Sequence, residues 1–363
     1  MLNNVVLRCI IYLLSFTVPI LFLSPDHVES ACPVSKIGNS EYNRWVQQTL
    51  PSLSLEEKIG QMLQVRAYGD YADFNDLHYR SVSEQIQRYH VGSIDLAARM
   101  RGPNLVKGRP SDVARILNDL QQSSKLPLLI AADLERGLAS RLSAVPEFPF
   151  PMAFGAVADT KIVSKFAAVT AQEARKVGIH WAYSPDADVN SNPGNPIINT
   201  RSFGEDPTEV GRLVAAYIKG AHENGMLTTA KHFPGHGDSS TDSHIGLVRI
   251  DSDRSHMDRY ELPPFKNAIG AGVDSIMLAH AAVPALDSDP TRIATNSRQI
   301  IKGLLQDELG FKGLVVTDAL EMRAVMSLYP READPSGVPA PDPDSPLPHP
   351  APAPIPAPAP AGV

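Results

Sequence analysis

Residues 231–247 read KHFPGHGDSSTDSHIGL and combine a lysine, three histidines and two aspartates with glycines and small polar residues. Burying unpaired charges or half-bonded imidazoles costs free energy, so this density of titratable side chains predicts a segment that faces a ligand or a metal. Pro234, Gly235 and Gly237 interrupt regular structure and predict a loop. The apolar run 226–230 before it is typical of a buried strand. Together they predict a catalytic or binding loop at a strand end of an α/β enzyme.

A metal site is the first alternative for this loop. His232 and His236 stand four residues apart, with Asp238, Asp242 and His244 nearby. Two histidines at this spacing bind zinc from one face of a helix, but Pro234 and Gly235 break helical geometry between them. We therefore expect no metal. His236 and Asp238 are expected to shape the loop.

The composition indicates a soluble enzyme with an addition at each end. The chain has 363 residues, 43% of them hydrophobic, and a net charge of −7, which argues against nucleic acid as a partner. Residues 1–30 hold Arg8 and a long apolar run, which predicts a signal peptide or a membrane anchor. Cys32 follows a weak lipoprotein-like sequence, so lipidation is a further alternative. We expect an exported protein, whether periplasmic, extracellular or membrane-anchored.

The remaining segments divide the chain further. Residues 31–52 form an N-terminal extension, and residues 53–329 carry the enzyme-like pattern. The tail 330–363 alternates proline with alanine, which removes amide donors and blocks helices, so we expect it to be extended and disordered.

Apolar runs alternate with amphipathic stretches between these ends. Such a repeat predicts parallel strands with helical crossovers, and the lack of a GxGxxG motif favours a (β/α)8 TIM-type barrel over an open dinucleotide-binding sheet. The final βα unit is not visible before the prolines, so the barrel is expected to lack it, leaving open edges and a tendency to self-associate. The expected strands are 62–65, 91–96, 127–132, 179–183, 226–230, 273–278 and 314–317, and the expected helices are 83–89, 110–124, 161–177, 207–224, 263–271 and 297–309.

Polar residues follow several of these strands. Strand ends share one face of a barrel, so these side chains are expected to converge on one pocket. Asp206 stands before Pro207 and is predicted to cap a helix, whereas Asp318 ends an apolar strand and needs a functional partner. The residues concerned are Asp133, Glu135 and Arg141, then Asp186, Asp188, Asn190 and Arg201, then the 231–244 loop, and finally Asp318.

Several motifs in the right order resemble glycoside hydrolase family 3, in particular its β-N-acetylglucosaminidase subgroup. They are LPLLIAADLERG, FPFPMAFGA, YSPDADVNSNPGNP, NTRSFGEDP, KHFPGHGDSSTDSH, ELPPFKNAIGAGVDSIMLAH and VVTDALEM. One departure is Arg136, where many relatives carry a second glycine.

The resemblance implies a retaining exo-glycosidase that removes terminal β-linked N-acetylglucosamine in two steps. Asp318 matches the nucleophile, and His244, polarised by Asp242, matches the acid/base. An ionised carboxylate and an imidazole with a pKa of about 6.5 suit these roles. The positions that match sugar-binding residues are Asp133, Arg141, Arg201, Lys231 and His232.

The resemblance implies a carbohydrate partner, with peptidoglycan fragments as one candidate substrate, and no cofactor. Membrane contact is expected only through an N-terminal anchor or lipid. The alternatives that stay open are a β-N-acetylglucosaminide phosphorylase, a β-glucosidase of the same family, and an inactive or sugar-binding truncated member. His244 favours the N-acetylglucosaminidase over the β-glucosidase, which takes its acid/base from a second domain.

Overall fold

The computed structural model of the chain describes residues 39–71, 74–102, 104–243, 246–289, 292–326 and 328. The predicted signal or anchor segment 1–30 and the proline-rich tail 330–363 lie outside this part, as does the expected acid/base His244. In the described ranges, no helix combines the length and apolar character needed to cross a membrane.

A curved parallel sheet organises the described chain, and it has seven strands that neighbour one another in sequence order. This confirms the predicted seven-stranded barrel architecture, and β1 and β11 form the two ends of the sheet among the described residues. Arg66 of β1 contacts Glu321 beyond β11 at 2.5 Å, so an ion pair joins the two ends. The strands are β1 (Gln64–Tyr68), β2 (Ser93–Ala97), β5 (Leu129–Ala132), β6 (Trp181–Ala182), β7 (Leu227–Phe233), β9 (Ser275–Leu278) and β11 (Leu314–Thr317).

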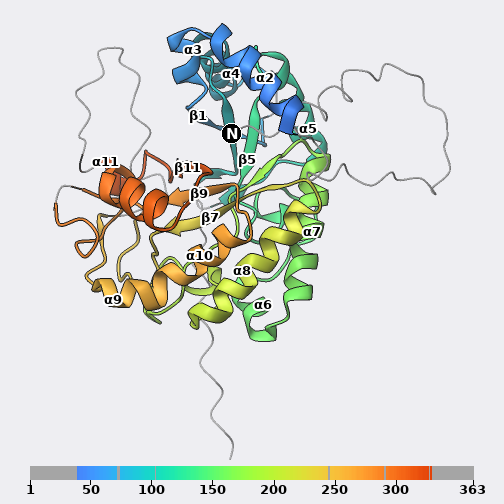
Figure 1. The fold of residues 1–363 in the computed structure, drawn as a ribbon. Coiled ribbons are helices and arrows are strands. Elements are labelled where there is room, and N and C mark those ends of the chain that lie inside the picture. The colour runs from blue at the N-terminus through green and yellow to red at the C-terminus, as the bar shows by residue number, and fades with distance from the viewer. Residues whose placement is uncertain are drawn as a thin grey trace, which may run out of the picture.

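Helices alternate with the strands, and α7, α8 and α10 lie side by side along one side of the sheet (Figure 1). Asp206 caps α8 as predicted, because its carboxylate accepts the Thr208 and Glu209 amides at 2.8 and 2.9 Å. The principal helices are α2 (Asn39–Ser52), α3 (Leu55–Gly60), α4 (Leu77–Tyr89), α5 (Pro110–Gln122), α6 (Pro151–Val157), α7 (Thr160–Lys176), α8 (Pro207–His222), α10 (Leu262–Gly270), the π-helix η6 (Gln299–Glu308) and α11 (Arg323–Met326).

Two apolar clusters cover the two faces of the sheet. The larger one packs alternate strand residues such as Ile94 and Ile130 against helix residues such as Phe166 and Phe265. Side chains two apart on a strand share a face, so the residues between them form the second cluster inside the curve. That inner cluster consists of Leu129, Ala131, Trp181, Tyr183, Leu227 and Met277, with Val316 packed against it.

Strand β7 is longer than predicted, and this corrects the expected loop. Lys231, His232 and Phe233 belong to the strand, and the loop begins at Pro234. The Lys231 carbonyl accepts the Ala187 amide at 2.6 Å, and the Phe233 carbonyl accepts the Ala279 amide at 2.8 Å. The buried side chains of Lys231 and His232 pair with carboxylates that follow β5 and β6. Because they are paired, the strand can continue through both residues.

Small additional sheets also lie outside the predicted pattern. They pair β3 (Arg99–Arg101) with β4 (Asn104–Val106) and β8 (Val248–Arg249) with β10 (Ala281–Ala282). The second pair joins the segment after the 234–247 loop to the segment after β9. This two-stranded sheet therefore holds the segment after the loop next to the segment after β9.

Candidate active site

The carboxyl ends of the strands bring the predicted polar residues together. Lys231 lies at the centre, with a side chain that is only 2% exposed. Its ammonium contacts Asp133 at 2.6 Å, Glu135 at 2.6 Å and Asp186 at 3.6 Å. Burial opposes the charge, but these three carboxylates outweigh it and raise the Lys231 pKa. The lysine therefore stays protonated.

Two arginines complete this arrangement. Arg201, at the end of the short helix η3 (Asn199–Arg201), holds Glu135 with both Nε and Nη2, at 2.9 and 2.8 Å. Its Nε also lies 3.3 Å from Asp186. Arg141 contacts Asp133, the carboxylate that also contacts Lys231. Three carboxylates thus face three cations, and we call these six residues the charge network: Asp133, Glu135, Arg141, Asp186, Arg201 and Lys231.

The carboxylates of the charge network differ in their affinity for protons. Burial favours the neutral form of Asp133, but Lys231 and Arg141 outweigh it and lower its pKa. Asp186 is fully buried, and burial raises its pKa to about 7 even though Arg201 opposes the change. The Asp133 side chain is 23% exposed, compared with 11% for Glu135 and 0% for Asp186, so it is the most accessible carboxylate of the network. It can accept hydrogen bonds from a ligand hydroxyl.

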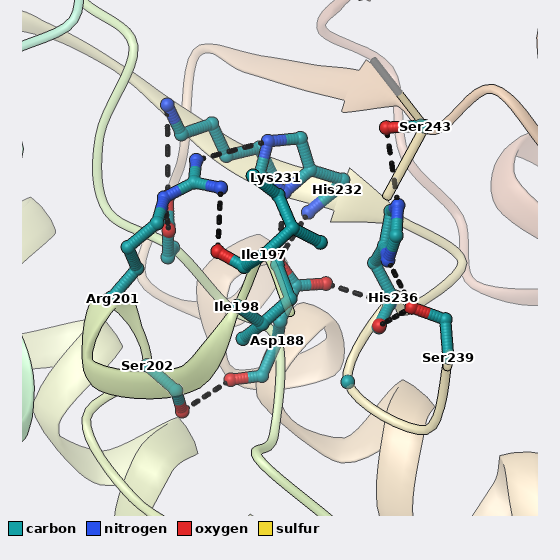
Figure 2. A network of polar contacts seen from close by, with 12 residues as sticks. Asp188, Ile197, Ile198, Arg201, Ser202, Lys231, His232, His236, Ser239 and Ser243 are labelled. Carbon is teal, nitrogen blue, oxygen red and sulfur yellow. Dashed lines mark hydrogen bonds and ion pairs between the residues drawn. The ribbon is translucent and has the colours of Figure 1, made fainter. Parts of the chain in front are cut away.

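A further carboxylate, Asp188, lies outside the charge network and connects β7 to the loop that follows it (Figure 2). One of its oxygens accepts the His232 amide at 3.1 Å and faces the His232 ring Nδ1 at 2.7 Å. The other accepts the His236 amide at 2.8 Å. Burial opposes protonation of His232, yet the Asp188 charge raises its pKa. Nε2 of the same ring lies 3.5 Å from Arg201, next to the charge network.

His236 shapes the loop, as its hydrogen bonds indicate. Its ring lies between the Ser239 and Ser243 hydroxyls, at 2.7 and 3.3 Å (Figure 2). Burial lowers its pKa to about 4, so the ring is neutral at pH 7. Asp238 accepts a hydrogen bond from Ser252, which is also a structural contact. Asp242 follows in this loop, and the Gly246 amide donates to its carbonyl at 3.2 Å.

Asp318 follows β11 and is half buried. One of its carboxylate oxygens accepts the Ala319 amide at 2.8 Å. The phenol of Tyr183, which follows β6, has a raised pKa, first because it is buried and then because of the charges of Asp95, Asp133 and Asp318. Because β11 runs parallel to the other strands of the sheet, Asp318 lies at the same carboxyl end as the charge network.

The structure brings most of the predicted site residues together. Asp133, Arg141, Arg201, Lys231 and His232 form one connected group, and Asp318 lies at the same carboxyl end of the sheet. Glu135, Asp186 and Asp188 were expected at these strand ends without an assigned role, and the structure shows them as the carboxylates that pair with Lys231, Arg201 and His232. In the part of the chain that the structure describes, no three His, Cys, Asp or Glu side chains gather as metal ligands do.

A curved parallel sheet with acidic and basic side chains at its carboxyl ends is the arrangement in which (β/α)8 barrels keep their active sites. The family follows from sequence: residues 54–336 match the Glycosyl hydrolase family 3 N terminal domain, and the chain belongs to that family.

The chain is similar to several characterised proteins. It is 38% identical over 268 residues to beta-hexosaminidase A of Pseudoalteromonas piscicida, covering 68% of this chain and 44% of that protein. A solved β-N-acetylglucosaminidase of family 3 from Paenibacillus sp. str. FPU-7 superposes with a TM-score of 0.70 at 38% identity, covering 77% of this chain and 51% of the other. A beta-glucoside phosphorylase superposes with a TM-score of 0.73 at 27% identity, covering 82% and 52%. The chain therefore spans about half the length of these relatives.

A buried acid, Glu261, packs against the loop that follows β7. Glu261, at the end of the π-helix η4 (Met257–Glu261), accepts the Ser191 hydroxyl at 3.2 Å. Gly235 lies directly on it, because a Cβ at that glycine would stand 2.6 Å from the Glu261 Cβ. Burial, assisted by the charge of Asp188, raises the Glu261 pKa to about 8.

This acid predicts a pH-dependent term in stability. The folded Glu261 keeps its proton up to about pH 8, whereas the unfolded chain loses it near 4.5, so its contribution to unfolding free energy falls as pH rises through that window. Glu261→Gln removes this loss. The difference in unfolding free energy between the variant and the wild type should therefore shift in favour of the variant by about 1.4 kcal/mol per pH unit. Denaturant unfolding at intervals between pH 5 and 8 measures it. Glu84→Gln on the exposed face of α4 is the control, and parallel curves for wild type and Glu261→Gln would refute the assignment.

Proposed function

We propose that this chain carries the catalytic barrel of a retaining exo-glycosidase that removes terminal β-linked N-acetylglucosamine. The observation that carries the proposal is Asp318, a carboxylate that follows β11 at the same carboxyl end of the parallel sheet as the charge network. The relatives named beta-hexosaminidase and β-N-acetylglucosaminidase support the substrate class.

In the proposed first step, the Asp318 carboxylate attacks the anomeric carbon and forms an ester bond to the sugar. The glycosidic bond breaks, and His244 donates a proton to the departing oxygen. In the second step His244 takes a proton from water, and that water displaces Asp318 from the anomeric carbon. Two inversions give net retention. Asp242, two residues before His244, fixes its tautomer in this scheme.

The charge network and His232 are proposed to bind the sugar. Hydroxyl groups and an N-acetyl group offer both donors and acceptors, which match Asp133 on one side and Arg141, Arg201, Lys231 and His232 on the other. Charge-assisted hydrogen bonds of this kind discriminate strongly against a sugar that lacks the matching group. The proposal places the enzyme outside the cytoplasm, through residues 1–30, with peptidoglycan fragments as one substrate.

Phosphorolysis is the second candidate function, because a beta-glucoside phosphorylase superposes on most of the chain. Phosphate and water would compete for the same glycosyl intermediate. Phosphate attack would give a sugar 1-phosphate in place of the free sugar.

The proposed reaction can be tested on synthetic substrates. An aryl β-N-acetylglucosaminide should be hydrolysed with net retention and far faster than the matching β-glucoside. Proton NMR of the first-formed sugar should show the β-anomer. An initial α-anomer would contradict the two-step mechanism, and sugar 1-phosphate formed on addition of phosphate would establish the phosphorylase instead.

The second prediction separates the two catalytic roles. Asp318→Asn should reduce turnover below detection yet still bind N-acetylglucosamine in calorimetry, with Asp251→Asn on the exposed surface as control. His244→Ala should slow substrates with poor leaving groups by about 10²- to 10⁴-fold, and activated aryl substrates much less, because only the former need a proton. Equal losses on both substrates in His244→Ala would argue against its acid role.

A further inference from the structure

His280 lies two residues beyond the end of β9, beside the turn that carries Asp318. The residue is buried, and both nitrogens of its ring contact groups of the protein. The ring Nε2 lies 2.9 Å from the Ala319 carbonyl, and Nδ1 lies 2.6 Å from the Thr295 hydroxyl. The Thr295 hydroxyl also lies 3.1 Å from the Ala279 carbonyl. This histidine therefore links β9, the short helix η5 (Ala294–Asn296) and the residue that follows Asp318.

The partners of the ring determine its tautomer. A carbonyl oxygen only accepts, so Nε2 must carry a proton and donate it to Ala319. Nδ1 then accepts a hydrogen bond from the Thr295 hydroxyl.

Ala319 is consequently fixed on both sides. Its amide donates to the Asp318 carboxylate at 2.8 Å, and its carbonyl accepts from His280. The Asp318 amide also donates to the Leu278 carbonyl at 3.2 Å, which continues the ladder between β11 and β9. Holding both peptide groups around Ala319 fixes the direction in which its amide meets the carboxylate. The orientation of the Asp318 side chain depends on that direction.

We propose that His280 is a positioning residue for the Asp318 nucleophile, acting through its Nε2 hydrogen bond to the Ala319 carbonyl. This inference rests on the proposed function, in which Asp318 attacks the sugar. His280 does not contact the substrate. Its effect is expected on the attack geometry and not on sugar binding.

Three substitutions test the position of the donor. Glutamine at 280 places an amide nitrogen near the site of Nε2, asparagine places it near Nδ1, and leucine removes the donor. His280→Gln should keep kcat within a few-fold, whereas His280→Asn and His280→Leu should lose roughly 10- to 100-fold, the scale of a small misplacement of a reacting group. KM for an aryl β-N-acetylglucosaminide should stay within about two-fold in all three, because binding is unchanged.

Rescue by glutamine but not asparagine, in variants with matching thermal transitions, supports the proposal. Full kcat in the asparagine variant, or equal losses in all three variants, would overturn it. If the wild type cleaves no hexosaminide, the proposed function fails separately. Crystal structures of the variants then decide: a turned Ala319 carbonyl in His280→Asn but not in His280→Gln supports positioning, and an unchanged carbonyl in both refutes it.

Discussion

The buried Lys231 ammonium is the constraint on which the rest of the site depends. With 2% of its side chain exposed, it needs neighbouring negative charge, because an unpaired buried ion costs several kcal/mol. Asp133 and Glu135 supply that charge from the turn after β5, and Asp186 from the turn after β6. Glu135 also holds Arg201, so one carboxylate fixes two cations. These contacts join the segments that follow β5, β6 and β7 at the carboxyl end of the sheet.

Asp188 extends the buried polar contacts from β7 to the loop that follows it. Its two oxygens accept the backbone amides of His232 at the end of β7 and of His236 within the loop. Gly235 of this loop packs against the buried Glu261. We propose that the side chains that pair at the strand ends also bind the sugar. In that proposal Asp133, which is 23% exposed, accepts hydrogen bonds from sugar hydroxyls, and Lys231 is one of the donors and holds Asp133 in place through their 2.6 Å contact.

The sequence predicted the seven strands, the parallel sheet, the family and the residues that gather at the strand ends, because strand periodicity and short motifs are local signals. The cap at Asp206 is local too and is confirmed. The end of β7 was wrong because distant partners decide it: the strand continues through Lys231 and His232, which Asp133 and Asp188 neutralise. The start of α4 was wrong although its signal is local, since the helix begins at Leu77, six residues before the predicted start, after the capping side chain of Asp76. The roles of Glu135, Asp186 and Asp188 likewise depend on contacts across strands that no spacing reveals.

If Lys231 neutralises the carboxylates of the charge network, Lys231→Met should destabilise the fold, because methionine keeps the shape of the side chain and removes its charge. Denaturant unfolding at pH 7 should show a loss of about 3–5 kcal/mol, the usual cost of leaving buried charge unpaired. Part of that loss should be recovered at pH 5, because carboxylates without the lysine take up protons more readily in the folded state than in the unfolded chain. If Lys231→Met is as stable as the wild type at pH 7, or if its loss of unfolding free energy is as large at pH 5 as at pH 7, Lys231 does not neutralise these carboxylates.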